Sequence, residues 1–268
     1  MNQSGPAKTI SEAEIETFHR DGVVCLRQVI EGSWIHKLQQ ASEDIRSKPS
    51  GGAFETRGAS GEGRYTFDRF LWTFNEDFKA FAFASRLPEI AAKAMRSRTA
   101  YLMLDLIFTK EPKTGVPTPW HHDQPYAWYD GNQVCQFWAP LDRVDIESGV
   151  LEFVRGSHRS TRWFNPAAPA GGDALALFPE IEVDRANCDV VHFDMEPGDC
   201  LLFHELTLHA APANSSARLR RGVAVHYAGD DATYAVRERG VFPIRDPGLK
   251  HGASFEGCDL FPRVWPKI

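Results

Sequence analysis

The sequence DCLLFHELTLHAAPANSSARLRRGVAVHYA, residues 199–228, holds the clearest pattern of secondary structure in the chain. Short apolar runs occupy residues 199–203, 206–210 and 219–227, and Asn214-Ser215-Ser216 supplies a turn signal between the last two. Runs of this length, bounded by turn residues, are typical of β-strands. The stretch therefore predicts three short strands in succession.

The same pattern extends toward the N-terminus. Further β-like runs lie at residues 99–109, 133–141, 149–154 and 189–194, and turn signals such as Ser148-Gly149 separate them. Many short strands without alternating helices favour an antiparallel sandwich or barrel over a parallel α/β sheet. We therefore predict a mainly β fold with flanking helices (α+β), of the jelly-roll or cupin kind.

Helical patterns precede the strands. Ser11 and Glu14 form a capping-box signature for a helix over residues 12–21, which Gly22 can end. A strand over 23–29 follows, and then apolar residues recur at helical spacing. The residues with this spacing are Trp34, Leu38, Ala41 and Ile45, which predict a second helix. Two more helices are predicted over 75–84 and 88–96.

Three segments carry neither pattern. Residues 48–64 are rich in Gly and Ser, which predicts a long loop or a mobile lid. Residues 162–187 are interpreted as an excursion between strands, and 230–268 as an extension that packs aromatic residues such as Phe261 and Trp265.

No linker divides the chain, so we predict one domain over residues 1–268. Its parts are a helical N-terminal part at about 11–97, a β core at about 98–228 and a C-terminal extension at 229–268.

The composition excludes several classes of protein. The 268 residues carry 30 Lys and Arg against 36 Asp and Glu, a formal charge of −6 without a basic cluster, which argues against nucleic acid as a partner. No apolar run reaches the length of about 18 residues that a membrane helix needs, and the first ten residues lack a signal-peptide core. The five cysteines form no CxxC pair, which predicts reduced thiols. We expect a cytoplasmic protein, and its oligomeric state does not follow from the sequence.

A candidate metal site begins at Trp120-His121-His122-Asp123. In an extended chain alternate residues share a face, so His121 and Asp123 point together and His122 points away. A distant histidine, His204 or His209, would complete the set. Two histidines and one carboxylate, with open positions, suit non-haem Fe(II) oxygen chemistry.

The residues after the two histidines favour His209. A hairpin turn between Asn214 and Ser215 would place His209 opposite Arg220, whereas His204 has no such partner. A guanidinium beside a metal ligand can bind the distal carboxylate of 2-oxoglutarate in a bidentate fork. Arg218 lies on the same strand face as Arg220 and is the rival candidate.

The aromatic residues Tyr126 and Trp128 follow the metal motif. They could line a substrate pocket or belong to the ordinary core, and the sequence leaves both readings open.

These motifs together resemble the phytanoyl-CoA dioxygenase family of Fe(II)- and 2-oxoglutarate-dependent oxygenases. The resemblance rests on WHHD (120–123), DGNQVCQFWAPLD (130–142), ESGVLEFVRGSH (147–158), PGDCLLFH (197–204) and the stretch from His209 to Arg220. It implies a double-stranded β-helix with iron held by His121, Asp123 and His209. It further implies that Arg220, Trp138 and Met103 contact the 2-oxoglutarate cosubstrate, and it implies no catalytic residue beyond the metal ligands.

The resemblance also implies a reaction. It is the hydroxylation of an unactivated C–H bond of a small-molecule substrate with O2, with release of succinate and CO2. The retained Asp123 argues for oxygenation, because related halogenases replace this carboxylate with a small residue. Ala211 stands where the family often has a serine that contacts 2-oxoglutarate, and Arg155 where it often has a proline. A coenzyme A ester is not expected, because no Lys/Arg cluster lies near the motif.

Two other classes of protein remain open. One is a cupin-like metalloenzyme that does not use 2-oxoglutarate, which would have no need of a carboxylate anchor at Arg220. The other is an inactive relative that only binds a small molecule.

Overall fold

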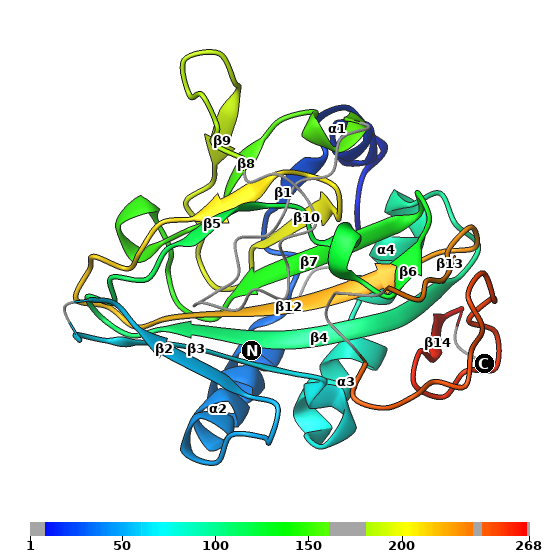
Figure 1. Cartoon of the computed structure of the whole chain (residues 1–268), viewed down its shortest axis with the longest axis horizontal. Helices are drawn as coiled ribbons and strands as arrows, with labels where there is room; N and C mark the ends of the chain where they lie inside the picture. Colours follow the sequence, from blue (N-terminus) through cyan, green and yellow to red (C-terminus); the bar gives the residue numbers. More distant parts are fainter. Residues whose placement is uncertain (1–8, 60, 161–180, 238–242, 267–268) are drawn as a thin grey trace, which may run out of the picture.

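Two antiparallel β-sheets face each other, and helices α2 and α3 lie on the outer side of the larger sheet (Figure 1). The computed structural model describes residues 9–59, 61–160, 181–237 and 243–266. The sheets and their flanking helices form the jelly roll that the sequence predicts, and the fold class is confirmed.

The large sheet has the strand order β1-β10-β7-β12-β4-β3-β2, and β14 also pairs with β4. Its strands are β1 (Val23–Leu26), β2 (Phe54–Arg57), β3 (Arg64–Arg69), β4 (Ala100–Lys110), β7 (Val134–Pro140), β10 (Cys200–His204), β12 (Arg220–Ala228) and β14 (Arg263–Trp265). The small sheet contains, in order, β5 (Thr118–His121), β11 (His209–Ala211), β8 (Glu152–Val154) and β9 (Val190–His192). A third pair joins β13 (Thr233–Tyr234) to β6 (Tyr129–Asp130).

Strand alternation divides the large sheet between two hydrophobic clusters. On β12, Val223 and Val225 belong to the cluster that the helices cover, whereas Ala224 belongs to the cluster between the sheets. Successive side chains of a strand point to opposite faces, so Arg220 and His226 share the inner face with Ala224. The inner face therefore carries polar residues as well as core residues.

The helices are confirmed close to their predicted limits. They are α1 (Glu12–Asp21), α2 (Gly32–Ser47), α3 (Glu76–Ala84) and α4 (Leu87–Ala94), with short 3-10 turns η1 (Leu71–Thr73), η2 (Gln124–Tyr126), η3 (Ile146–Ser148) and η4 (Ser157–Arg159). The Ser11–Glu14 capping box is present, and Gly22 ends α1 at a φ of 80°, a left-handed conformation that favours glycine.

The prediction of a loop over residues 48–64 is wrong for residues 54–57. Strand β2 lies inside this segment and pairs with β3, which in turn pairs with β4. The β core is likewise not confined to 98–228, because β1, β2, β3 and β14 join the large sheet. Strand β1 lies within the strand predicted over 23–29, whereas the sequence patterns miss β2, a short polar edge strand that its neighbour β3 stabilises.

The predicted hairpin between residues 209 and 220 is also wrong. Strand β11 pairs with β5 and β8 in the small sheet, while β12 pairs with β4 and β7 in the large sheet. Between them the chain crosses from one sheet to the other. The Asn214 side chain holds this crossover by donating hydrogen bonds to the carbonyls of Lys110, Glu111 and Arg218.

The C-terminal extension packs against the sheets as expected. Phe261 is fully buried and stacks on Trp128 with ring centroids 5.8 Å apart, and Trp265 packs against the outer cluster. All five cysteines are free, and Cys135 and Cys200 are buried. Of the predicted excursion at 162–187, residues 162–180 lie outside the described residues.

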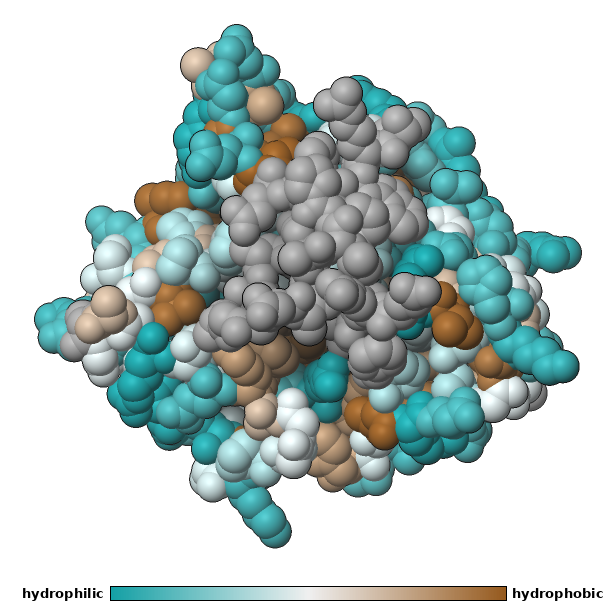
Figure 2. All heavy atoms as spheres, viewed as in Figure 1, coloured by the Kyte–Doolittle hydropathy of each residue, from teal (hydrophilic) through white to brown (hydrophobic). Residues whose placement is uncertain are grey.

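Figure 2 shows one face of the molecule coloured by hydropathy. Among its described residues most are hydrophilic, and the hydrophobic ones form small separate groups. No helix in the described parts of the chain has the length and apolar character needed to cross a membrane. The cytoplasmic location and the single domain remain predictions.

The close approach of Gly222 to Trp138 yields a stability prediction. A Cβ atom at Gly222 would lie 2.1 Å from Cζ2 of the buried Trp138 ring. We expect Gly222→Ala to lower the free energy of unfolding by about 1–3 kcal/mol, measured by urea denaturation, because the indole has to move within a packed core. Gly51→Ala is the control, because no atom lies within 4 Å of its added Cβ. Equal stability of the two variants would contradict the packing described.

Candidate metal centre

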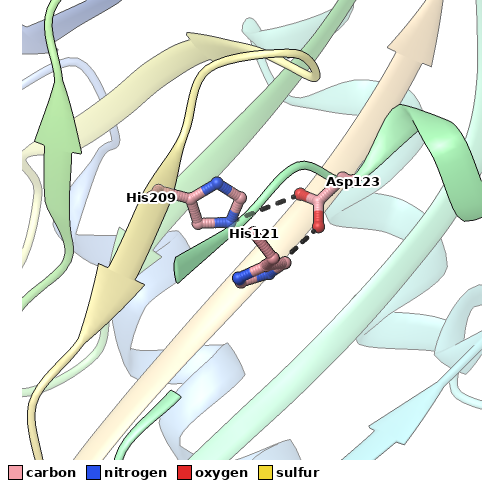
Figure 3. A group of neighbouring side chains, drawn as sticks. All are labelled: His121, Asp123 and His209. Atoms are coloured by element: carbon pink, nitrogen blue, oxygen red, sulfur yellow. Dashed lines mark ion pairs between the residues drawn. The ribbon is translucent and has the colours of Figure 1, made fainter. Parts of the chain in front are cut away.

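Three side chains converge where β5 and β11 pair (Figure 3). His121 ends β5, His209 begins β11, and the two residues are direct partners in the antiparallel register. Nε2 of His121 lies 3.3 Å from Oδ1 of Asp123, and Nε2 of His209 lies 3.5 Å from Oδ2 of the same carboxylate. Potential ligand atoms of all three residues lie within 4.8 Å of one another. The predicted triad is thus brought together.

Backbone contacts fix the orientation of both imidazoles. Nδ1 of His121 lies 2.8 Å from the carbonyl of Pro119, and Nδ1 of His209 lies 2.9 Å from the carbonyl of Thr207. Since a carbonyl can only accept, each Nδ1 carries the proton and each Nε2 keeps its lone pair. This tautomer presents both Nε2 atoms as ligands beside the carboxylate, as metal-binding histidines usually do.

Asp123 reaches the site by a route other than the predicted one. Strand β5 ends at His121, and Asp123 begins the 3-10 turn η2 with φ −88° and ψ −44°. The backbone N–H of Asp123 donates to the carbonyl of Glu205, 3.0 Å away, which holds the turn against the segment between β10 and β11. The carboxylate therefore points back toward the histidines because the chain turns, not because it stays extended.

The electrostatics of His209 and Asp123 suit a cation, whereas the Asp123 carboxylate outweighs burial and raises the pKa of His121. Burial lowers the pKa of His209 to about 4, and the neighbouring His121 adds to this effect. Burial opposes ionisation of Asp123, but His209 and His121 outweigh it and hold the pKa of this carboxyl below its ordinary value. A neutral imidazole and an ionised carboxylate are the forms that bind a divalent metal.

The other histidines near the motif are engaged elsewhere. His204 accepts a hydrogen bond at Nδ1 from the backbone of Leu206, and its Nε2 lies 3.0 Å from the carbonyl of Asn132. His122 is buried beside the cavity and belongs to neither group of potential ligands found in the described residues. His209 is therefore the distal histidine of the triad, as the sequence favours.

A second group of potential ligands shares Asp123. It consists of Asp123, Glu205 and His226, all within the same distance limit. Glu205 is fully buried, and its Oε1 lies 2.8 Å from Nδ1 of His226. The first group is the better metal site, because it offers two imidazole Nε2 atoms, whereas the second group has a single imidazole that is already bonded to Glu205. The sequence analysis assigned no role to Glu205 or His226.

The triad opens into a cavity of about 340 Å³. Aromatic and aliphatic side chains make up most of its wall, with a few polar groups, which is typical of small-molecule sites. The predicted residues Tyr126, Trp128, Trp138 and Arg220 all line it, together with Tyr65, Phe67, Arg69 and Gln136, which the sequence did not indicate. Met103 is fully buried in the inner core cluster and is not among the lining residues, so its predicted cosubstrate contact has no support.

Arg220 stands at one end of this cavity, 2% exposed. Its guanidinium carbon lies 4.6 Å from the ring centroid of Trp138, and Nη2 donates to the carbonyl of Gly149. Nε is buried without a hydrogen-bond partner. Burial lowers the pKa of Arg220 to about 10, so the group stays charged at neutral pH. The rival Arg218 instead bonds to Asp145 and is half exposed.

A second buried cation lies beside Arg220. Lys110 is its direct partner across β4 and β12, and its Nζ donates to the carbonyl of Pro212, 2.8 Å away. Among the described residues neither cation forms an ion pair with a carboxylate. Burial, with a smaller contribution from Arg220, lowers the pKa of Lys110 well below its ordinary value. Of the two residues, Arg220 lines the cavity.

A jelly roll with two histidines, one carboxylate and a buried arginine in one cavity defines the class of non-haem iron oxygenases that use 2-oxoglutarate. The chain belongs to the phytanoyl-CoA dioxygenase family, whose family model matches residues 18–222. Fe(II) and 2-oxoglutarate are the cofactor and cosubstrate of this family.

Curated relatives carry the same family name. The chain is 26% identical over 168 residues to the human peroxisomal phytanoyl-CoA dioxygenase, covering 60% of this chain and 49% of that protein. It is 26% identical over 142 residues to a probable phytanoyl-CoA dioxygenase of Caenorhabditis elegans, covering 52% and 46%. The chain thus spans about half the length of the curated relatives it matches.

Solved structures share the fold over almost the whole chain. The non-haem α-ketoglutarate-dependent carbocyclase SnoK of nogalamycin biosynthesis has a TM-score of 0.77 at 23% identity, covering 97% of this chain and all of that one. The epimerase SnoN of the same biosynthesis has a TM-score of 0.75 at 22% identity, covering 94% and 97%.

The two groups of potential ligands lead to a metal-binding prediction. We expect His209→Ala to weaken Fe(II) binding by about a hundredfold or more, because one of three ligands is lost. Anaerobic calorimetry measures this affinity. Glu205→Gln removes a carboxylate from the second group only, and we expect it to bind Fe(II) as the wild type does. If Glu205→Gln weakened Fe(II) binding and His209→Ala did not, the metal would be assigned to Asp123, Glu205 and His226.

Proposed function

We propose that this chain is an Fe(II)- and 2-oxoglutarate-dependent oxygenase that oxidises a small molecule. One observation carries the proposal: the buried guanidinium of Arg220 lines the cavity that holds the triad, and it forms no ion pair with a carboxylate among the described residues. Burying unpaired charge is costly, so a site of this kind is expected to receive an anion. A dicarboxylate could bind Arg220 through one carboxylate and reach a metal at the triad with its other end.

Arg220 would hold the distal carboxylate of 2-oxoglutarate. Its free Nε–H can donate to the carboxylate, and contact with Trp138 and Gly149 keeps the guanidinium in place. The missing serine hydroxyl at Ala211 has a substitute nearby. Thr118 is the register partner of Ala211 and lines the cavity, so its hydroxyl faces the same end.

His121, Asp123 and His209 would hold the iron. Their donor set of two neutral imidazoles and one carboxylate matches non-haem Fe(II), and it leaves positions for other ligands. When bound, the metal and cosubstrate supply an oxidant that removes hydrogen from an unactivated C–H bond, with release of succinate and CO2. The protein contributes the geometry and the dry cavity.

Tyr126 and Trp128 would bind the substrate. Both are buried and line the cavity, and Trp128 is held between Phe70 and Phe261, with ring centroids at 5.5 and 5.8 Å. Aromatic walls exclude water and favour an apolar substrate body. The chain shows no basic cluster for the phosphates of coenzyme A, so we propose a small metabolite and not an acyl-CoA.

Hydroxylation is the outcome we propose for the oxidised carbon. Asp123 retains the carboxylate that related halogenases replace with a small residue, which argues against halogenation. The fold itself does not select the outcome, since the similar structures are described as an epimerase and a carbocyclase. A cupin-like enzyme without 2-oxoglutarate would explain the triad, but it would leave Arg220 and Lys110 without a ligand.

The cosubstrate site is tested by arginine variants. We expect Arg220→Ala to raise the KM for 2-oxoglutarate by about a hundredfold, measured as succinate formed from 2-oxoglutarate under O2, because a buried charge-assisted contact is lost. Arg218→Ala is the matched control, since Arg218 bonds to Asp145 outside the cavity, and its KM should not change. An unchanged KM in Arg220→Ala would contradict the assignment.

The reaction type is tested with isotopically labelled O2 once a substrate is found by succinate release. Hydroxylation places one labelled oxygen atom in the product, whereas epimerisation or ring closure leaves the product without label. Efficient turnover of phytanoyl-CoA by the purified protein would contradict the proposal of a small metabolite.

A further inference from the structure

The cavity has a second cationic side chain at the end away from Arg220. Tyr65, Phe67 and Arg69 alternate along β3 and all line the cavity. Tyr65 pairs with Lys110 in the Arg220 row, whereas Arg69 pairs with Leu106. Four residues of strand separate the two rows by about 13 Å. Arg69 thus lies in the substrate part of the cavity.

Arg69 is unlike most arginines of this protein. Arg64 on the same strand bonds to Glu111, Arg221 bonds to Asp142, and Arg237 bonds to Asp130. The side chain of Arg69 makes no ion pair or hydrogen bond within the described residues, and its Nε is buried and unpartnered.

The nearby carboxylates do not serve Arg69. Asp68 accepts hydrogen bonds from the backbone and the hydroxyl of Ser50. Glu205 also lines the cavity, but its carboxylate is bonded to His226. Burial lowers the pKa of the partly buried Arg69, and the neighbouring Asp68 charge offsets only part of this effect. The charge is therefore left for a ligand.

A second unpaired donor lies in the same part of the cavity. The indole Nε1–H of Trp128 is buried without a hydrogen-bond partner, and Trp128 lines the cavity. Phe70, which follows Arg69 in the chain, stacks on Trp128, so the indole is held close to this end of β3. Buried N–H groups are rarely left unsatisfied unless a ligand completes them.

We propose that Arg69 binds an oxyanion of the substrate, a carboxylate or a phosphate, with the indole N–H of Trp128 as a second donor. The substrate is then a small organic acid whose apolar body lies against Phe67 and the aromatic wall. This inference rests on the proposed function, because it assigns Arg220 to the cosubstrate and Arg69 to the substrate. It makes Arg69 a residue that determines substrate specificity.

The test uses the full chain loaded with Mn(II), which replaces Fe(II) without turnover, and with saturating 2-oxoglutarate. The probes are phenylacetate, hydrocinnamate and phenyl phosphate, with phenylacetamide and hydrocinnamamide as neutral counterparts. Calorimetry gives their affinities. We expect the wild type to bind at least one anion about ten- to a hundredfold more tightly than the amides, and Arg69→Gln to lose this preference. Carboxylate and phosphate probes distinguish the two kinds of oxyanion.

Two variants control for loss of fold or of charge. Arg57→Gln removes the same charge from the exposed edge strand β2 and should keep the preference. Arg69→Lys should keep part of it. The inference is wrong if no anion binds the wild type better than an amide, or if Arg69→Gln retains the preference. The affinity for 2-oxoglutarate, measured first in each variant, should not depend on Arg69. A wild-type protein that does not bind 2-oxoglutarate would instead count against the proposed function.

Discussion

The register pairing of His121 with His209 across β5 and β11 is the contact on which the rest of the site depends. It sets the two imidazoles 4.2 Å apart between ring centroids, with both Nδ1 atoms bonded to backbone carbonyls. The turn after β5 then brings Asp123 back to face both Nε2 atoms. A shift of one residue in this register would turn one imidazole to the other face of the sheet and separate the ligands.

The large sheet, which faces the strands of the two histidines, supplies basic side chains that metal binding alone would not require. Arg220 and Lys110 lie side by side on β12 and β4, and Arg69 lies further along β3. Because alternate residues of these strands face the cavity, one sheet can present cations at two depths while its other face packs on the helices. The jelly roll thus combines the His121–Asp123–His209 triad on one side of the cavity with the proposed anion-binding arginines on the large sheet.

Part of this site could be predicted from the sequence because its signals are local. The spacing of His121 and Asp123 is visible within one motif, and Arg220 follows His209 at a recognisable distance. The reasons given for both were incomplete: Asp123 reaches the site through a turn, and His209 and Arg220 lie on different sheets. Arg69 and Glu205 could not be predicted, because what distinguishes them is burial and the absence or presence of a partner, which depends on chain segments far apart. Strand β2 was not predicted for a similar reason: the segment around it is rich in glycine, and the strand is stabilised by pairing with its neighbour.

The central claim is that the triad and Arg220 together hold a metal chelated by 2-oxoglutarate. Anaerobic titration of the purified protein with Fe(II), followed by 2-oxoglutarate, tests it most directly. We expect a weak visible metal-to-ligand charge-transfer band after the second addition, and no band when succinate, which lacks the keto group, is added instead. Iron binding without a band on addition of 2-oxoglutarate would contradict the account.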